Sequence, residues 1–250
     1  MSGHSKWSSI KHKKGAADAK RGKLFSKLAR AIIVAARDGG PDPDANLALA
    51  NAIEKARQNA MPKDNIERAI ARGSGATTDG EAYEPITYEG YGPGGVAILV
   101  DAVTDNRNRT AAEIRHLFAK HDGNLGTSGA VSWLFERRGL VFADADRVDE
   151  DELTLAAAEG GAEDVMRDGS TLQVVSAADD LPNVRAALDE AGISYESADV
   201  TMLPKTTVRV EDEALARKIL RLMDALDEND DVQEAYSNFD IPERVLEAVA

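Results

Sequence analysis

Residues 85–103, PITYEGYGPGGVAILVDAV, decide the fold, because they predict two strands joined by a tight turn. Apolar and polar side chains alternate over 85–91, and in 96–103 every second residue of the first half is a valine or isoleucine on one face. Gly-Pro-Gly-Gly at 92–95 supplies the turn. The sequence therefore predicts an antiparallel sheet that starts near residue 85.

The chain after this hairpin predicts alternating helices and strands. The expected helices lie at 110–121, 150–159, 182–191 and around 215–226, with a short one at the end of the chain. The expected strands lie at 140–142, 171–175, 195–200, 206–210 and 232–239, with one more that holds Val131, Trp133 and Phe135. This order fits two α/β units of ferredoxin-like type. The final strand-helix-strand can complete the sheet begun at residue 85, so we expect 139–200 to be inserted into a middle domain of 81–138 plus 201–250.

The chain before the hairpin predicts a domain of three short helices over 20–75. Leu24, Leu28 and Ile32 form an apolar stripe on the first helix, and Asp42-Pro43 or Asp44 is expected to open the second. Helices this short are marginal alone, so they must pack on each other. Residues 1–19 are expected to be a basic, mobile tail. The whole chain is thus predicted to be an α+β multidomain protein, with a three-helix domain before the two ferredoxin-like domains.

Positive charge is confined to one end of an acidic chain. The protein has a formal net charge of −14, yet its first 37 residues hold ten Lys or Arg and one Asp. Residues 73–250 hold 15 basic and 37 acidic residues, a net charge of −22, and the acidic inserted segment 139–200 alone carries −13. A basic end attracts phosphate while the acidic body keeps the protein soluble. The alternative interpretation is a merely solvated, charged terminus.

Two groups of residues are therefore candidates for binding nucleic acid. On the first helix, basic residues recur opposite the apolar stripe and form a ridge, and the tail before it adds more cations and Trp7, which either stacks on a base or packs on the helices. The candidates at this end are Lys6, Trp7, Lys11, His12, Lys13, Lys14, Lys20, Arg21, Lys23, Lys27 and Arg30.

The second group is the loop after the best strand, where Asn106, Arg107 and Arg109 offer planar donors suited to phosphate or base edges. The competing interpretation of this loop is structural. Asp105 or Asn108 would cap the following helix, and Arg109 would pair with Glu113 one turn later.

Enzyme chemistry finds no support in the sequence. The absence of cysteine excludes disulfides, thiolate nucleophiles and iron–sulfur sites, and it fits the cytoplasm, where we place the protein. Gly90, Gly92 and Gly95 imitate a dinucleotide-binding pattern, but a strand follows them where that pattern requires a helix. The four histidines are not spaced as metal ligands, and no apolar run is long enough for a membrane span. We expect no catalytic residue, no cofactor, no metal and no membrane contact.

Several motifs together resemble one known family. They are MSGHSKWSSIKHKK at 1–14, PKDNIERAI at 62–70, YEGYGP at 88–93, DNRNRT at 105–110, DDVQ at 230–233 and YSN at 236–238. Over essentially its whole length, the chain resembles the YebC/PmpR family. The resemblance implies three domains, the last inserted into the second, and no enzymatic activity. Bacterial members are known as DNA-binding transcriptional regulators, and relatives, which include a mitochondrial translational activator, act in translation and relieve ribosome stalling.

The sequence thus predicts a non-enzymatic, nucleic-acid-binding regulator of gene expression, first of all a DNA-binding transcriptional regulator. The alternative is a ribosome-associated translation factor whose basic end contacts rRNA or tRNA, and a third possibility is a protein-interaction scaffold. Lysine suits phosphate contact with little sequence discrimination, so the physics does not separate DNA from RNA. The sequence leaves open the sequence specificity, the target genes and the role of the acidic domain. It also leaves open the oligomeric state, with which a monomer is compatible.

Overall fold

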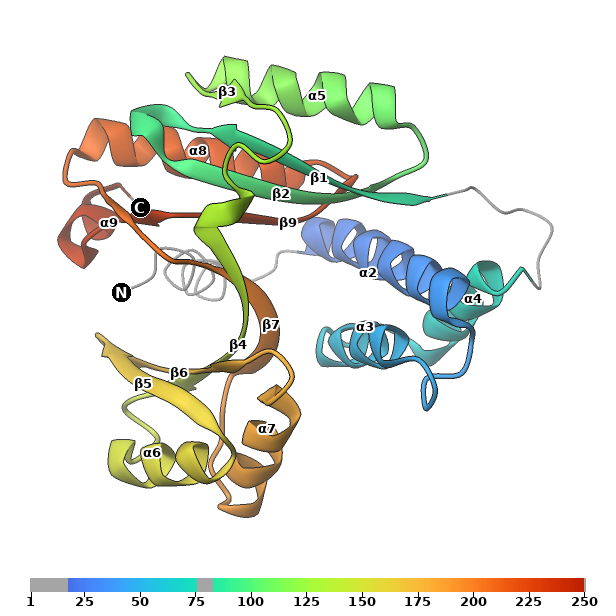
Figure 1. Cartoon of the computed structure of the whole chain (residues 1–250), viewed down its shortest axis with the longest axis vertical. Helices are drawn as coiled ribbons and strands as arrows, with labels where there is room; N and C mark the ends of the chain where they lie inside the picture. Colours follow the sequence, from blue (N-terminus) through green and yellow to red (C-terminus); the bar gives the residue numbers. More distant parts are fainter. Residues whose placement is uncertain (1–17, 76–82, 250) are drawn as a thin grey trace.

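The computed structural model describes residues 18–75 and 83–249, which form three domains (Figure 1). The helical domain consists of α2 (Asp18–Gly39), α3 (Leu47–Gln58) and α4 (Lys63–Gly73). Leu28 and Ile32 of α2 are buried against Leu49 and Ile53 of α3, as the apolar stripe predicts.

The predicted start of the second helix at Asp42–Asp44 is wrong. Asn46 caps α3, and its Oδ1 accepts a hydrogen bond from the Leu49 amide at 3.1 Å. Its Nδ2 donates to the carbonyls of Ala35 and Gly40, so one side chain both opens α3 and ties it to the end of α2. The Asp42 carboxylate instead accepts from the Asp44 amide in the preceding turn.

The middle domain is a four-stranded antiparallel sheet with two helices on one face (Figure 1). Its elements are β1 (Glu84–Tyr91), β2 (Ala97–Thr104), α5 (Arg107–Lys120), β3 (Asn124–Leu125), α8 (Glu213–Glu228) and β9 (Val232–Ser237). The strand order is β3-β1-β2-β9, with the predicted hairpin at its centre. Because β9 pairs with β2, this domain is built from two stretches of chain that are far apart in sequence.

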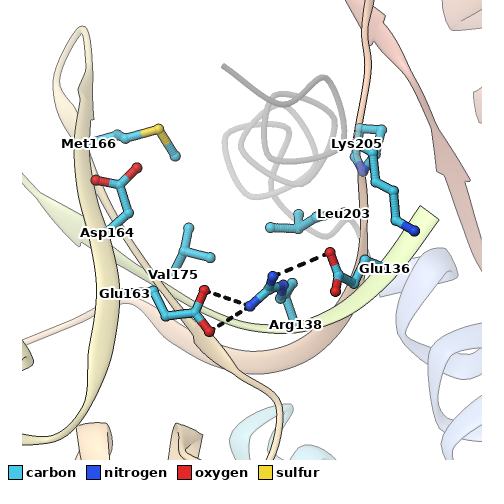
Figure 2. A pocket seen from close by; sticks show the side chains of 9 residues that line it. Glu136, Arg138, Glu163, Asp164, Met166, Val175, Leu203 and Lys205 are labelled. Atoms are coloured by element: carbon cyan, nitrogen blue, oxygen red, sulfur yellow. Dashed lines mark hydrogen bonds and ion pairs between the residues drawn. The ribbon is translucent and has the colours of Figure 1, made fainter. Parts of the chain in front are cut away.

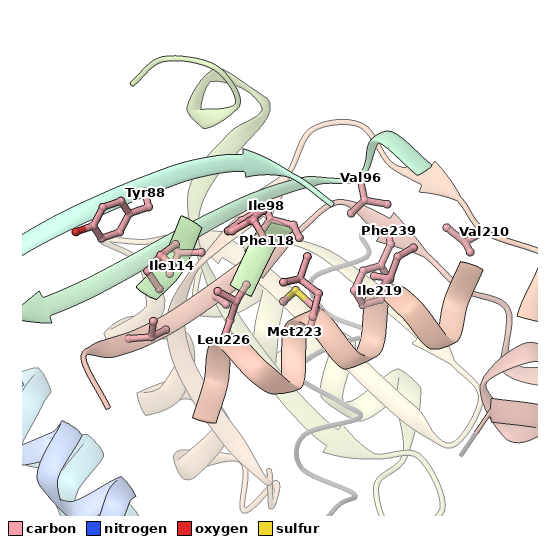
Figure 3. Packing of buried hydrophobic residues seen from close by; sticks show 14 of the residues in the cluster. Tyr88, Val96, Ile98, Ile114, Phe118, Val210, Ile219, Met223, Leu226 and Phe239 are labelled. Carbon is pink, nitrogen blue, oxygen red and sulfur yellow. The ribbon is translucent and has the colours of Figure 1, made fainter. Parts of the chain in front are cut away.

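The core of the middle domain lies between this sheet and the two helices (Figure 3). Ile114 and Phe118 of α5 and Ile219 and Met223 of α8 are fully buried against Ile98 of β2. The turn between β1 and β2 contains the short helix η1 (Pro93–Gly95), and a two-stranded parallel pair, β8 (Val208–Arg209) and β10 (Phe239–Asp240), precedes the terminal helix α9 (Glu243–Val249).

The inserted domain has a β-α-β-β-α-β order. Its elements are β4 (Phe135–Asp144), α6 (Glu150–Glu159), β5 (Ala162–Asp168), β6 (Thr171–Ala177), α7 (Leu181–Glu190) and β7 (Ser197–Pro204). The sheet order β5-β6-β4-β7, antiparallel throughout, is that of a ferredoxin-like domain. The α+β fold class, with a helical N-terminal region and two four-stranded antiparallel sheets, is confirmed.

The predicted strand with Val131, Trp133 and Phe135 is wrong in its first part. Residues Ser132–Leu134 form a short 3₁₀ turn, η2, and β4 begins only at Phe135. Val131 and Phe135 are buried while Trp133 is 65% exposed, so the alternation does not come from one pleated strand. In the described part of the chain, no helix is long and apolar enough to cross a membrane.

Candidate nucleic-acid interface

Much of the predicted basic end lies outside the described residues. Lys6, Trp7, Lys11, His12, Lys13 and Lys14 belong to residues 1–17. Lys20 lies in the first turns of α2, and Arg21, the next residue, is exposed. Arg21 is therefore the first predicted contact whose side chain the structure places at the surface.

The position of the apolar stripe predicts that the basic ridge of α2 faces solvent. Part of this ridge instead lies against the acidic turn, residues 227–231, at the junction of α8 and β9. The Lys27 ammonium donates to the Asp227 carbonyl at 2.6 Å, and Lys23 donates to the Glu228 carbonyl at 3.3 Å. Lys23 also lies 3.6 Å from an Asp230 carboxylate oxygen. These cations therefore hold the helical domain on the middle domain.

Arg30 completes this contact between the domains. Its guanidinium donates to the Asp230 carbonyl and lies 3.0 Å from Oδ1 of Asp231, whose side chain is only 5% exposed. Arg30 also lies over the ring of Tyr83, 5.4 Å from its centroid. We conclude that Arg30 serves domain docking in this structure.

The loop before α5 is largely structural. Asn106, rather than Asp105 or Asn108, caps α5, because its Oδ1 accepts from the Arg109 amide at 3.1 Å. The Arg109 guanidinium lies 2.7 Å from both Asp105 and Asp231 and 3.9 Å from Glu113. The structural interpretation of Arg109 is thus the one that the contacts support.

Asp231 joins this loop to α2. Besides Arg30 and Arg109, its carboxylate accepts from the hydroxyls of Thr110 at 2.6 Å and Thr104 at 3.2 Å. Burial of Asp231 disfavours its charge, but the hydrogen bonds from Thr110 and Arg109 and the charges of Arg109 and Arg30 outweigh burial and lower its pKa. The carboxylate is ionised at neutral pH and binds three elements together.

Arg107 differs from its neighbours in the loop. Its side chain is 66% exposed, and the nearest carboxylate oxygen, from Glu84, is 3.8 Å away. An exposed pair of this kind contributes little to stability. Of the three predicted residues in this loop, Arg107 alone presents its charge to solvent.

Sequence reasoning missed a second group of cations, on the outer side of α5 and α8. Arg115 and Lys120 of α5 and Arg221 of α8 are exposed, and no ion pair joins them to any residue that the structure describes. Burial, Lys120 and Arg221 together lower the pKa of His121, which places both cations close to it. We call Lys120 and Arg221 the α5–α8 patch; Arg115, five residues before Lys120, lies on another face of α5. No sequence signal indicates it, because packing alone brings together residues about a hundred positions apart.

The open face of the inserted sheet carries a cavity of about 250 Å³, which is not suited to phosphate (Figure 2). Arg138 at its floor is held by both carboxylate oxygens of Glu163, at 2.6 Å each, and by Glu136 at 3.2 Å. Three carboxylates face two cations among the lining residues, so the cavity is acidic. In the described portions, no group of three or more His, Cys, Asp or Glu residues is arranged to hold a metal ion.

Comparisons with known proteins agree with this architecture. Residues 5–76 match the model of the TACO1/YebC protein N-terminal domain, and residues 83–239 match that of the TACO1/YebC second and third domain. A crystal structure of a conserved hypothetical protein from Aquifex aeolicus is 51% identical, with a TM-score of 0.81 over 90% of this chain and 93% of that one.

Curated relatives are similar from end to end. A protein of Rubrobacter xylanophilus named "probable transcriptional regulatory protein" is 60% identical over the full length of both chains. One of Syntrophobacter fumaroxidans with the same name is 55% identical, again over both full lengths. Two family models that together span most of the chain, and relatives at this identity, lead to one conclusion: the chain belongs to the TACO1/YebC family.

Proposed function

We propose that this protein is a non-enzymatic regulator of gene expression that binds nucleic acid through its basic N-terminal end and the α5–α8 patch. The observation that carries the proposal is the separation of charge. The first 37 residues have ten Lys or Arg and one acidic residue, whereas residues 73–250 carry a net charge of −22. A polyanion is attracted to such an end and repelled by most of the remaining surface.

The contacts of α2 support a proposal in which only part of its basic ridge binds phosphate. Lys27 and Arg30 contact the acidic turn, as does Lys23, so we assign phosphate binding to the cations from Arg21 toward the N-terminus. The α5–α8 patch adds two exposed cations in the otherwise acidic body. Phosphate contacts of this kind give affinity and position, with little sequence discrimination.

We place transcription first, with DNA as the ligand. The names of the Rubrobacter and Syntrophobacter proteins support this version, because both proteins are similar in sequence to this one over its entire length. Ribosome-associated regulation of translation is the second candidate. It is favoured by the fixed position of α2, because a helix held along the middle domain by Lys27 and Arg30 is poorly placed to enter a major groove.

Crosslinking in cells, followed by sequencing of the attached nucleic acid, tests the proposal and separates its two versions. Enrichment of promoter DNA supports the transcription factor, and enrichment of rRNA or tRNA supports the translation factor. The full chain should also bind oligonucleotides in solution with a log–log salt slope of roughly −4 to −7, as about five to eight phosphate contacts require. A variant without residues 1–17 should show a markedly shallower salt slope. Absence of any attached nucleic acid, together with no binding in solution, would overturn the proposal.

A further inference from the structure

Two exposed aromatic side chains lie together beside the loop that leads from β3 to β4. Trp133 is 65% exposed and Tyr91, at the end of β1, is 39% exposed. The Trp133 indole donates to the Ala130 carbonyl at 3.2 Å, and the Tyr91 hydroxyl donates to the same carbonyl at 3.0 Å. A shared acceptor places the two donors side by side. We call Tyr91 and Trp133 the aromatic pair.

Glu89 holds this loop in place. Its carboxylate accepts hydrogen bonds from the amides of Gly129, Val131 and Ser132, each at 2.7 Å. Burial disfavours the charge of Glu89, which is 6% exposed, but these three bonds and one from the Ser132 side chain outweigh burial and lower its pKa. The Glu89 carbonyl accepts a further bond, from the Gly126 amide at 2.7 Å. The backbone that carries Trp133 is therefore fixed although its ring is exposed.

The loop is also uncharged. Residues 123–135, GNLGTSGAVSWLF, contain no Asp, Glu, Lys or Arg in a chain where such residues make up 30%. The apolar neighbours Val131 and Phe135 are buried beneath it. The surface offered to a partner is thus a neutral aromatic face in a preset orientation, and ordering it on binding costs little conformational entropy.

The aromatic pair lies on the face of the sheet opposite α5 and α8. Glu89 and Tyr91 alternate along β1 with Tyr88, which packs on those helices. The loop over this face carries no carboxylate, whereas residues 73–250 together have a net charge of −22, so it does not add to the repulsion of a polyanion. Stacking on aromatic rings is a usual way in which proteins hold unpaired bases.

We infer that the aromatic pair is a stacking platform for an unpaired nucleobase, with Trp133 as its main face. This inference rests on the proposed function and specifies the nucleic acid: a single strand, loop or bulge whose base can leave its own stack. An uninterrupted duplex keeps its bases inside and cannot use the platform.

The test uses the full chain with Trp7→Phe, which leaves Trp133 as its single tryptophan, since the protein has two. Uridine 12-mers, a duplex of the same length and a hairpin with an unpaired loop are titrated while Trp133 emission is recorded. The single strand and the hairpin should quench the emission, and the duplex should leave it nearly unchanged. Every variant is compared within this background, so that any contribution of Trp7 to affinity cancels.

Trp133→Ala in the same background, followed by fluorescence anisotropy of labelled RNA, should weaken single-strand binding about 5- to 100-fold, which corresponds to the stacking of one base. Trp133→Phe should retain most of the affinity, and the salt slope should not change, because no phosphate contact is lost. Leu155→Ala is the matched control, because Leu155 is 66% exposed and lies on α6 of the inserted domain.

The two proposals fail in different ways. If the protein binds RNA with the expected salt slope but Trp133→Ala binds equally well and the emission is not quenched, the platform is overturned and the proposed function stands. Quenching by RNA-free ribosomal proteins and not by RNA would also overturn the platform, and would make the aromatic pair a protein-docking site. If no nucleic acid binds at all, the proposed function itself fails.

Discussion

Asp231 is the residue on which the docking of two domains depends. It is buried, it is ionised, and it receives donors from α2, β2 and α5. A buried carboxylate with good geometry on every side adds little net stability compared with an apolar residue, but its removal leaves its partners without an acceptor. Removing the Asp231 carboxylate should therefore lower the free energy of unfolding by much more than the carboxylate adds relative to an apolar residue.

Asp231→Ala should lower the free energy of unfolding by about 3 to 5 kcal/mol, because Arg30, Arg109 and Thr110 lose their common acceptor. Urea denaturation followed by circular dichroism measures the effect. Asp230→Ala is the control, since the Asp230 side chain is 65% exposed and its change should cost about 0.5 kcal/mol or less. Similar values for the two variants would show that the Asp231 contacts do not stabilise the fold.

The same residue sets a pH dependence. Its pKa in the folded protein lies below the ordinary value of 3.8, so its contribution to stability is complete above that value and is lost as the pH falls through the lower folded pKa. The difference in stability between the wild type and Asp231→Asn should be constant from pH 5 to pH 8 and should shrink only below pH 4. Unfolding curves at several pH values check this, and a difference that varies near neutral pH would contradict it.

At the scale of single elements, α2 shows how far a pattern in the sequence can be taken. Its periodicity correctly predicts which face packs on α3 and α4, because that packing is local. The opposite face meets the acidic turn about two hundred residues later, and no local pattern reveals such a contact. Likewise, alternation at Val131, Trp133 and Phe135 imitates a strand, whereas the amides of this segment bond to Glu89.

Other elements show the same difference between features encoded nearby in the sequence and contacts made with distant residues. The hairpin β1–β2 and helices α6 and α8 were predicted well, because their alternation, caps and apolar stripes are encoded nearby. Strand β5 had no prediction, since its sequence AEDVMRD is mostly charged and only partly buried. Of the candidate binding residues with described side chains, Arg21 and Arg107 are exposed at the surface, while Lys27, Arg30 and Arg109 were assigned without knowledge of their partners.

Two changes in α2 separate binding from docking. Arg21→Glu should weaken nucleic-acid binding and leave the melting temperature almost unchanged, because Arg21 is exposed. Lys27→Glu should lower the melting temperature, because it places a carboxylate against the Asp227 carbonyl. Differential scanning fluorimetry and fluorescence anisotropy on the same preparations measure both properties. Equal melting temperatures for the two variants would contradict the docking role of Lys27.

The α5–α8 patch should contribute separately to the salt dependence of nucleic-acid binding. Replacing Lys120 and Arg221 with Gln removes up to two phosphate contacts, so the salt slope of binding should become shallower by up to about 1.8 units. Their exposure predicts a folded protein with nearly wild-type stability. Arg147→Gln, at an 80% exposed site in the inserted domain, serves as the control for loss of positive charge. A slope equal to that of the wild type would remove the patch from the interface.

At the scale of the whole molecule, helix α3 meets both other domains through ion pairs. Lys55 pairs with Glu234 of β9, whose charge raises the pKa of Lys55, and Glu54 lies 3.4 Å from Arg185 of α7. The pair with Arg185 is partly exposed, so salt screens it more than the buried contacts of Asp231. The inserted domain is therefore held less firmly against α3 than the middle domain is held against α2.

Raising the salt concentration to about 1 M, where the screening length falls to about 3 Å, should loosen the contact of α7 with α3 first. Hydrogen exchange should then accelerate in α7 while the Asp231 region keeps its protection. Glu54→Gln should reproduce this acceleration at low salt, and Glu67→Gln on α4, which pairs with Lys63 at 3.4 Å within its own helix, should not. Simultaneous acceleration of exchange in α7 and around Asp231 would contradict the prediction that the contact of α7 with α3 is the weaker one.

The inserted domain enters and leaves the middle domain at one place. Phe135 opens β4 opposite Pro204, which closes β7, and the Lys205 amide donates to the Leu134 carbonyl at 2.8 Å. The two ends of the surrounding chain thus already meet without the domain between them. In genetic terms, the inserted domain is removable as one continuous segment, because a short turn between Leu134 and Lys205 would close the surrounding chain.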